Sequence, residues 1–315
     1  MDKINCQICS TKLEQTNITH NEYRLYSCEN CDFHAWYPRK IDVSFYENDD
    51  LGFQQNLHED IQRLPLWTEF FFKNLNKIGA TGKKILDVGC GNGSFLKEMK
   101  DKGYDCYGLD LDRYAVKVAK KKIAEDKIFH CKLEDLEKID SKFLGYFDII
   151  TFFEVIEHQD DLDNFINHLK KYLKPHGVLV GSTPNTNRWI NGLGFREVSD
   201  YPPHHFNWFS LKSLNKLFEK HQFSVSFYPA YTKVTGADLR YRVLSAIFKE
   251  KYARATKPII VSQESSFYVK SKKSIRRKIR QVLDLAFLIL SPIATLLNKN
   301  KEISFHIGFI AKYEK

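Results

Sequence analysis

A short apolar segment that runs into three glycines constrains the fold of this chain more than any other feature. Residues 84–89 (KILDVG) have the composition of a buried strand, and residues 90–93 (CGNG) follow directly. The next residues place Phe95, Leu96 and Met99 at helical spacing. Strand, glycine turn and helix in this order open a doubly wound α/β sheet, where the turn lets the backbone approach a ligand closely.

Two acidic residues narrow the kind of ligand that this turn would hold. Asp87 lies inside the strand just before the glycines, where it would repel a pyrophosphate but attract an ammonium group. The next strand, over residues 105–110, ends in Asp110, about 20 residues further along the chain. A carboxylate at that place accepts hydrogen bonds from both ribose hydroxyls. Because dinucleotide-binding folds share the glycine loop, the loop alone does not decide the ligand.

The sequence around these residues resembles the class I S-adenosylmethionine-dependent methyltransferases. The segments DVGCGNGSF and GLDLD are similar to motifs I and II of that family. The resemblance continues through residues 147–158 (FDIITFFEVIEH) and 173–185 (LKPHGVLVGSTPN), and ordered matches cover roughly residues 84–230. It implies a Rossmann-like, seven-stranded α/β sheet and a methyltransferase activity in the EC 2.1.1 class. The alternative is a nucleotide-binding protein of another reaction class.

The resemblance also implies which residues meet the methyl donor. Gly89, Gly91 and Gly93 would cradle its methionine part, and Asp110 would hold its ribose. Many relatives carry an Asp after the third strand that meets the adenine, whereas this chain has Lys132 there. Backbone and side-chain groups of the next two residues would then supply the adenine contact. The expected donor-binding residues are Asp87, Gly89, Cys90, Gly91, Gly93, Asp110, Leu111, Leu133, Glu134 and Phe153.

A cluster of acids and histidines follows the fourth strand, at the sheet edge where ligands of open α/β sheets lie. Glu154, Glu157 and His158 occupy positions i, i+3 and i+4, which share one face of a helical turn. This ExxEH pattern is similar to the small-RNA 3′-end 2′-O-methyltransferases and to the ubiquinone-pathway O-methyltransferases. Similarity to the former group implies that His205, in HHFNW, is a fourth ligand for Mg²⁺. Three roles are open: a catalytic metal site, a metal-free base at His158 or His205, and a structural cap.

Four of the seven cysteines stand in two CxxC pairs near the start of the chain. Cys6 and Cys9 are separated from Cys28 and Cys31 by 18 residues that include a strand-like segment at 23–27. This spacing predicts a zinc ribbon over residues 1–45, with a closed structural Zn²⁺ site that takes no part in catalysis. Free redox thiols are the alternative. Because no apolar stretch follows Met1, we expect no signal peptide and a cytoplasmic protein.

The remaining residues, 46–315, are expected to form the methyltransferase domain, with an insertion at 231–302. A helix over 162–173 and strands over 177–183, 223–228 and 304–311 would complete the sheet, the last strand antiparallel. Between Thr232 and Gln281 stand 14 Lys and Arg against 3 Asp and Glu, whereas the whole chain has a net charge of +9. This basic run precedes an apolar segment too short to span a bilayer. It suits either a peripheral anchor through 270–297 on the inner face of an anionic membrane, or a helix pair over the acceptor pocket or at a dimer contact.

We therefore expect an O-methyltransferase that acts on a sugar or another small metabolite, either free or lipid-linked, in glycan or natural-product biosynthesis. The cysteine ribbon and the segment FYEND (residues 45–49) resemble a subgroup with such substrates, in which the N-terminal module shapes or covers the acceptor pocket. Trp189, Phe206 and Trp208 are candidates for the pocket walls. A metal-dependent RNA 2′-O-methyltransferase and a non-catalytic scaffold that binds the cofactor are the alternatives, and nucleic acid is the less favoured partner because the basic residues gather in one segment.

Overall fold

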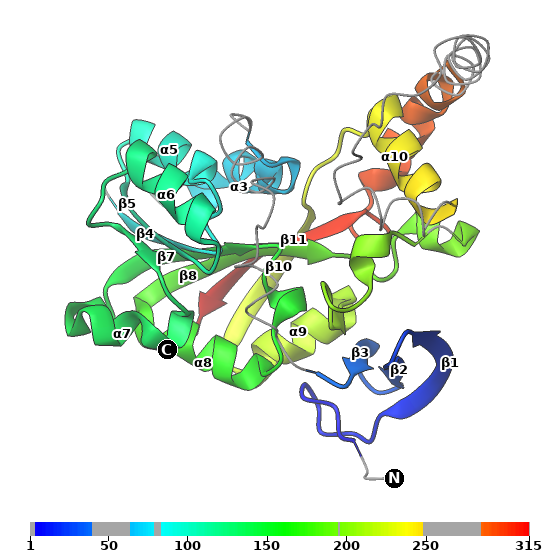
Figure 1. Cartoon of the computed structure of the whole chain (residues 1–315), viewed down its shortest axis with the longest axis horizontal. Coiled ribbons are helices and arrows are strands. Elements are labelled where there is room, and N and C mark those ends of the chain that lie inside the picture. Colours follow the sequence, from blue (N-terminus) through cyan, green and yellow to red (C-terminus); the bar gives the residue numbers. More distant parts are fainter. Residues whose placement is uncertain (1–3, 40–63, 79–82, 195, 248–284, 315) are drawn as a thin grey trace, which may run out of the picture.

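The computed structural model describes residues 4–39, 64–78, 83–194, 196–247 and 285–314 (Figure 1). Its strands are β1 (Glu14–His20), β2 (Tyr23–Cys28), β3 (Phe33–Tyr37), β4 (Lys84–Val88), β5 (Asp105–Asp110), β6 (Ile128–His130), β7 (Phe147–Phe153), β8 (Leu173–Pro184), β9 (Asn207–Trp208), β10 (Phe223–Pro229) and β11 (His306–Tyr313). Its α-helices are α3 (Glu69–Lys73), α4 (Leu75–Ile78), α5 (Ser94–Asp101), α6 (Arg113–Lys122), α7 (Leu136–Ile139), α8 (Leu162–Tyr172), α9 (Leu211–Lys220) and α10 (Gly236–Ile247). Short 3₁₀ turns are η1 (Leu66–Thr68), η2 (Leu133–Asp135), η3 (Ser141–Phe143), η4 (Ile156–His158), η5 (Trp189–Leu193) and η6 (Val198–Asp200).

The central sheet has seven strands in the order β10-β11-β8-β7-β4-β5-β6. The strands from β8 to β6 pair in parallel, whereas β11 runs antiparallel to both β8 and β10. This mixed sheet is typical of class I methyltransferases and confirms the predicted fold class. Strands β5 and β6 lie on one side of β4, whereas β7 and β8 lie on its other side, so the strand order changes direction between β4 and β7. The carboxyl ends of these two strands therefore border the crevice in which such sheets bind ligands.

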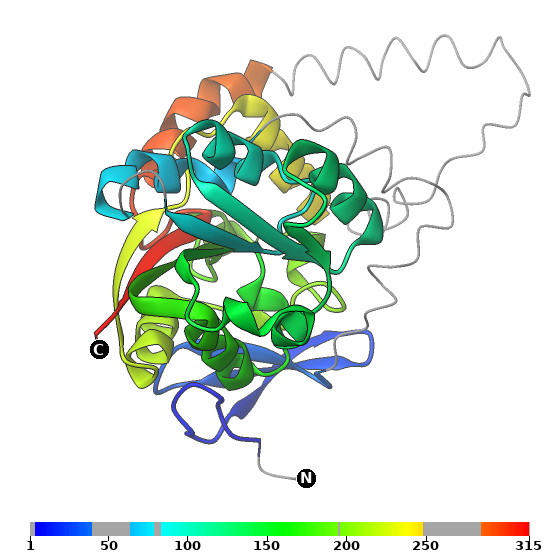
Figure 2. The same ribbon diagram turned by 90° about the vertical axis from the view of Figure 1, so that its left-hand side faces the viewer.

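Helices cover both faces of this sheet (Figures 1 and 2). Helices α3, α5 and α6 lie on one face, and α7, α8 and α9 lie on the other. The packing follows the sequence pattern, because the buried residues of each helix recur at intervals of three and four. In α8 these are Leu162, Phe165, Ile166, Leu169 and Tyr172. The five residues of β4, by contrast, are almost entirely buried, as expected for a parallel strand covered on both sides.

A second, smaller sheet contains the N-terminal module and a strand from the domain that carries the central sheet. Strands β1, β2 and β3 form an antiparallel meander, and β9 pairs antiparallel with β3 at its edge. Trp36 of β3 is fully buried against Phe206 and Trp208, which flank and occupy β9. Of the three aromatic residues predicted to wall the acceptor pocket, Phe206 and Trp208 therefore lie in the joint between module and core, whereas Trp189 lies in η5. The predicted module boundary at residue 45 and the FYEND segment lie outside the described residues.

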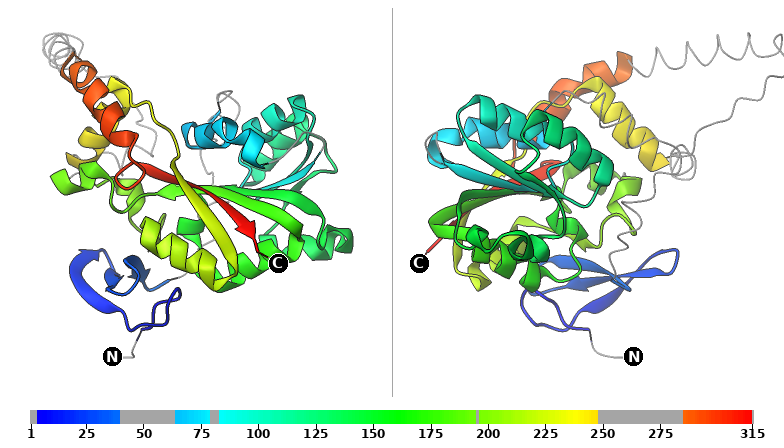
Figure 3. Two further views of the ribbon diagram at one scale, coloured as in Figure 1. Left: turned by 180° about the vertical axis from the view of Figure 1, so that it is seen from behind. Right: turned by 60° about the vertical axis from the view of Figure 1, so that its left-hand side comes forward.

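The observed elements differ from the prediction mainly at two places. The strand predicted over 177–183 is β8, which begins at Leu173, because Leu173 already pairs with Phe147 of β7. The last strand begins at His306 rather than residue 304, since Ser304 caps the preceding turn through hydrogen bonds to backbone carbonyls. Within residues 231–302, the structure describes α10 and a helix over 285–298 that lie beside each other (Figure 3). The basic run at 270–280 lies outside the described residues.

Candidate functional site

The turn after β4 has the backbone geometry of a ligand cradle. Gly89, Gly91 and Gly93 all adopt positive φ, at 74°, 52° and 73°, a region that favours glycine. A Cβ at Gly89 would come within 2.6 Å of the Val155 side chain, and one at Gly93 within 2.9 Å of Ala119. A Cβ at Gly91 would meet no atom within 4 Å. The turn is thus tightly packed at its two ends and borders open space at its middle glycine.

Asp110 at the carboxyl end of β5 is held in place by backbone amides. Its two carboxylate oxygens accept hydrogen bonds from the Gly91 amide at 2.7 Å and from the Asp112 amide at 2.8 Å. The first of these bonds ties the middle of the glycine turn to β5. A carboxylate offers about four acceptor positions, so anchoring by two amides is compatible with hydrogen bonds to a diol. Asp110 therefore sits where a ribose would meet both the turn and the acid.

A cavity of about 370 Å³ opens at the carboxyl ends of these strands. Six predicted donor-binding residues line it, namely Gly89, Asp110, Leu111, Leu133, Glu134 and Phe153. Lys132, which replaces the usual acid, also lines it, together with Cys131. The structure places the other four predicted residues outside the lining: Asp87, Cys90, Gly91 and Gly93. Asp87 is buried below the turn, where it accepts a hydrogen bond from Thr151 at 2.6 Å, and burial raises its pKa well above the usual value.

Glu154 lies apart from the other members of the ExxEH pattern. The expected helical face does not form, because Glu154 takes a positive φ of 55° and η4 begins only at Ile156. The Glu154 carboxylate instead accepts a hydrogen bond from Ser182 at 2.7 Å and lies 3.2 Å from Nε2 of His306. His306, the first residue of β11, was not predicted. Glu154 lines the cavity and so brings this pair to its wall.

Glu157, His158 and His205 form a compact group next to the cavity. One ligand atom of each lies within 4.8 Å of the others. Glu157 is fully buried; one carboxylate oxygen accepts from Thr183 at 3.1 Å, and the other finds no hydrogen-bond partner among the described residues. That second oxygen lies 3.9 Å from Nε2 of His205. Burial, reinforced by the charge of Glu154, raises the pKa of Glu157 well above its ordinary value.

A hydrogen bond to the backbone orients the His158 imidazole, whereas the His205 imidazole faces a carboxylate that lies beyond hydrogen-bond distance. Nδ1 of His158 lies 2.6 Å from the carbonyl oxygen of His204, which can only accept, so Nδ1 carries the proton and Nε2 is the acceptor nitrogen. Nδ1 of His205 lies 3.9 Å from the Asp200 carboxylate, which in turn pairs with the buried Arg188. Burial lowers the pKa of His158 to about 4 and that of His205 well below its usual value. Both rings are therefore neutral near pH 7, which is the form that binds metals.

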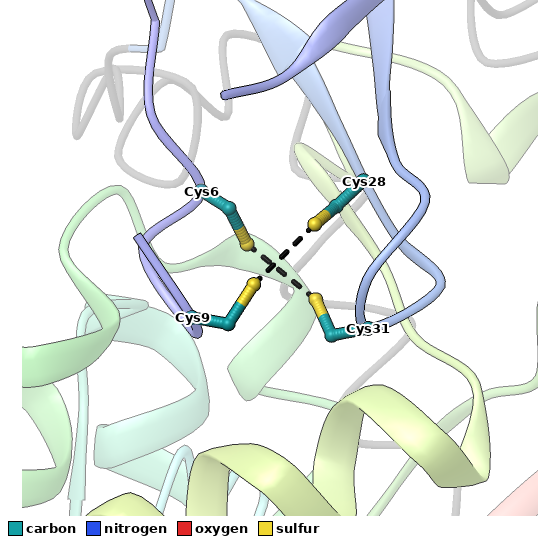
Figure 4. Close-up of side chains that lie close together, drawn as sticks. All are labelled: Cys6, Cys9, Cys28 and Cys31. Atoms are coloured by element: carbon teal, nitrogen blue, oxygen red, sulfur yellow. Dashed lines mark hydrogen bonds between the residues drawn. The ribbon is translucent and has the colours of Figure 1, made fainter. Parts of the chain in front are cut away.

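The four N-terminal cysteines converge on one point (Figure 4). The sulfur of Cys6 lies 3.5 Å from that of Cys31, and the sulfur of Cys9 lies 3.4 Å from that of Cys28. All four sulfurs lie within 4.8 Å of one another. A tetrahedral ion with metal–sulfur bonds of about 2.3 Å requires sulfur separations of about 3.8 Å. The hydrogen bond with Cys31 lowers the pKa of Cys6 to about 5, so a thiolate is accessible in this group. The geometry thus suits a four-cysteine metal site.

The cysteine module forms hydrogen bonds with the segment that follows β7. The side chain of Gln7, between the first two cysteines, donates to the carbonyl oxygen of Asp160 at 2.8 Å and accepts from the Leu162 amide at 3.0 Å. Arg39 donates to the Gln159 carbonyl at 2.8 Å and to the Asn207 side chain at 2.7 Å. Gln159 and Asp160 line the cavity. The module therefore fixes one wall of the cavity, although neither Gln7 nor Arg39 carried a recognisable signal in the sequence.

Replacing Gln7 by Ala tests this grip. We expect Gln7→Ala to weaken binding of the methyl donor by roughly five- to tenfold, because two hydrogen bonds worth about 1 kcal/mol each would be lost from the cavity wall. Isothermal titration calorimetry measures the change. Gln15→Ala is the matched control, since Gln15 is exposed on β1 of the same module and its side chain accepts a hydrogen bond from Tyr26 of β2. Equal affinities of the two variants would contradict a role for Gln7 in the cavity.

Comparison with known proteins places this arrangement in a family. A family described as a methyltransferase domain matches residues 57–226, more than half of the chain. The chain belongs to this methyltransferase-domain family. The matched residues contain the glycine turn, Asp110 and the group around Glu157.

Curated relatives of this methyltransferase-family chain include ubiquinone biosynthesis O-methyltransferases. The protein from Acinetobacter baylyi is 32% identical over 111 residues, which are 35% of this chain and 47% of that protein. The mitochondrial protein from Schizosaccharomyces pombe is 36% identical over 123 residues, 38% of this chain and 44% of that protein. The chain thus spans about half the length of the curated relatives it matches. Among solved structures, a methyltransferase from Archaeoglobus fulgidus aligns with a TM-score of 0.49 and 17% identity, over 84% of this chain and 100% of that one.

Proposed function

We propose that this chain is an S-adenosylmethionine-dependent O-methyltransferase that acts on a hydroxyl group of a sugar or another small metabolite. The observation that carries the proposal is a single cavity bordered by Gly89 and Asp110 at one end and by Glu154 and His158 at the other. The first pair suits the donor, and the second pair supplies groups that act on the acceptor. The names of the curated relatives, which are O-methyltransferases, agree with this assignment.

The residues around the cavity fit the donor. Gly89 at the cavity wall borders the methionine part, Asp110 accepts from the ribose hydroxyls, and Leu111 and Leu133 offer apolar surface to the adenine. S-Adenosylmethionine supplies an electrophilic methyl group on a sulfonium. Transfer of that methyl is an in-line displacement, so the protein chiefly has to align the acceptor oxygen and to take its proton. Without a bound cation, His158, with Nε2 as its acceptor nitrogen, lines the cavity and can take that proton.

The group of Glu157, His158 and His205 is also suited to a divalent cation, and we assign it that role. The unpartnered buried oxygen of Glu157, the fixed tautomer of His158 and the carboxylate behind His205 are the features of a first ligand shell with oriented imidazoles. A bound cation would lower the pKa of an acceptor hydroxyl. With two imidazoles and one carboxylate, the group favours Mn²⁺ or Zn²⁺ over the Mg²⁺ that the sequence suggested, and Glu154 stays outside it.

Chelation tests the cation assignment. We expect EDTA to reduce methyl transfer at least tenfold, and Mn²⁺ to restore it better than Mg²⁺. Release of S-adenosylhomocysteine is the readout, and donor binding by calorimetry should stay unchanged. Glu157→Gln should show the low activity of the chelated enzyme at every metal concentration. Full activity in EDTA would leave His158 as a metal-free base.

The four clustered cysteines are best explained as a structural zinc site. Four thiolates fill a tetrahedral coordination sphere and leave no position for a substrate, so this metal would stabilise the module rather than react. Through Gln7 and β9 it would also hold the cavity wall and the segment that carries His205.

Product analysis tests the proposed function as a whole. Purified protein is incubated with methyl-labelled S-adenosylmethionine and with fractionated cell extract, glycolipid extract or small RNA as separate acceptors. Label in a small or lipid-soluble product supports the proposal, whereas label confined to RNA supports the 2′-O-methyltransferase alternative. Binding of the donor without label in any fraction would support the scaffold alternative.

A further inference from the structure

An apolar groove lies on the surface between α10, η5 and the helix over 285–298. Its volume is about 300 Å³, at the lower end of the range for ligand sites. Every residue that lines it is apolar: Trp189, Ile190, Leu193, Leu239, Val243, Phe287, Leu290, Ile293, Ala294 and Leu297. Figure 3 shows the two helices projecting together from the end of the sheet that carries β11. The indole N–H of Trp189 is the polar side-chain group in this lining, and it is buried, so the groove suits a hydrocarbon better than a sugar or a nucleotide.

The exposed side of the same helix is also apolar. Leu285, Leu288, Ile289 and Leu296 are 58–68% exposed. Single exposed apolar residues are normal on protein surfaces, but a run of them on one helix marks an interaction surface. Among the described residues of the chain, no helix is both long and apolar enough to cross a bilayer. A surface of this kind can instead lie at the boundary between head groups and acyl chains.

The positive charges on both sides of this helix favour an anionic membrane, rather than a second protein, as the binding partner of the apolar groove. The sequence immediately before this helix carries seven Lys and Arg and no acid between residues 270 and 280. Lys299 and Lys301 are exposed just after it. Basic residues on both sides of an apolar helix match an anionic lipid surface, each worth about 1 kcal/mol near the membrane.

A row of rings leads from the groove to the cavity. Trp189 in the groove wall lies 5.4 Å from Phe305, and Tyr231 lies 6.4 Å from Phe305 and 5.5 Å from His306. His306 contacts Glu154, which lines the cavity. Because Phe305 and Tyr231 are buried, these rings form a packed wall between the groove and the cavity, and the head group of a lipid bound in the groove would reach the cavity around that wall.

From these observations we infer that the groove binds the hydrocarbon tail of a membrane-lipid acceptor, whose head group receives the methyl. One part of this inference, that the head group receives the methyl, rests on the proposed function. Binding of the tail is independent of the donor, so failure of one assignment does not imply failure of the other.

The test uses the full chain and cis-parinaric acid, a fluorescent fatty acid that brightens in an apolar site. We expect saturable binding that Ile293→Glu weakens at least tenfold, because a charge would then face the groove. Leu296→Glu is the matched control: Leu296 is 68% exposed on the same helix but does not line the groove, so its variant should bind the probe normally. Circular dichroism confirms that both variants fold.

Several outcomes would overturn the inference. Absence of saturable fluorescence, or equal loss of binding in both variants, would show that the groove does not hold the tail. A concentration-dependent dimer in sedimentation experiments that Ile293→Glu dissociates, and that excludes the probe, would assign the groove to a second copy of the chain. In a second arm, vesicles with 30% phosphatidylglycerol should bind the wild type, and both variants should bind these vesicles more weakly. Vesicles of phosphatidylcholine alone should bind neither the wild type nor the variants.

Discussion

A Cys28→Ser/Cys31→Ser variant should lose its bound zinc and, with it, most of its methyl transfer. Removal of one CxxC pair leaves two thiolates, which do not close a tetrahedral site. Structural zinc contributes roughly 10–16 kcal/mol to the folding of small zinc modules, so β1–β3 should unfold. Because β9 pairs with β3, and Gln7 bonds to residues 160 and 162, the segment that carries His205 and one cavity wall should lose their support.

Three measurements on this variant distinguish the loss of zinc, the loss of donor binding and the loss of methyl transfer. Plasma mass spectrometry should find one zinc equivalent in the wild type and less than a tenth of one in the variant. Calorimetry should show weaker donor binding, and methyl transfer should fall at least a hundredfold. Cys106→Ala, which alters a buried cysteine of β5 away from the cluster, should keep its zinc. Zinc loss with unchanged activity would mean that the module does not support the site.

Replacement of Asp110 by Ala should weaken binding of S-adenosylmethionine by about a hundredfold. Two hydrogen bonds to a charged carboxylate contribute roughly 3 kcal/mol together, and each 1.4 kcal/mol corresponds to a factor of ten. The variant would also release the Gly91 amide, and with it the tie between the glycine turn and β5. Isothermal titration of both the donor and its demethylated product gives the change directly.

Asp105 at the opposite end of β5 provides the matched control for this prediction. It pairs with Lys127 at 2.6 Å on the surface, so Asp105→Ala removes an acid from the same strand without touching the cavity. Its donor affinity should match that of the wild type. Donor binding by Asp110→Ala at wild-type strength, with an unchanged thermal transition, would rule out the ribose assignment.

The parts of this site that the sequence predicts are those set by local geometry. The glycine turn follows from three closely spaced glycines, and its φ values explain why glycine stands there. The four cysteines converge because each CxxC turn delivers two sulfurs, and the spacing between the pairs fits one hairpin. The order of the central sheet followed from the resemblance to the class I family, whose strand pattern recurs along the chain.

The parts that escaped prediction depend on contacts between distant segments. His306 reaches Glu154 only because β11 inserts next to β8, and its pairing is invisible in either segment alone. Glu154 was placed on a helical face because the spacing of ExxEH fits one, but the positive φ at that residue turns its side chain elsewhere. Gln7 looked like a spacer between two ligands, and only the docking of the module onto α8 reveals its bonds.

The connection between the edge strand β10 and its neighbour β11 carries α10 and the helix over 285–298, and this position has a consequence for how such enzymes diversify. A hairpin loop at the rim of a sheet can lengthen or change composition while the register of its strands is kept. The donor, by contrast, is gripped by the interior strands, which tolerate little change. If this segment holds the acceptor, as we propose, then changes within it would alter the choice of acceptor while the strands that border the donor cavity stay the same.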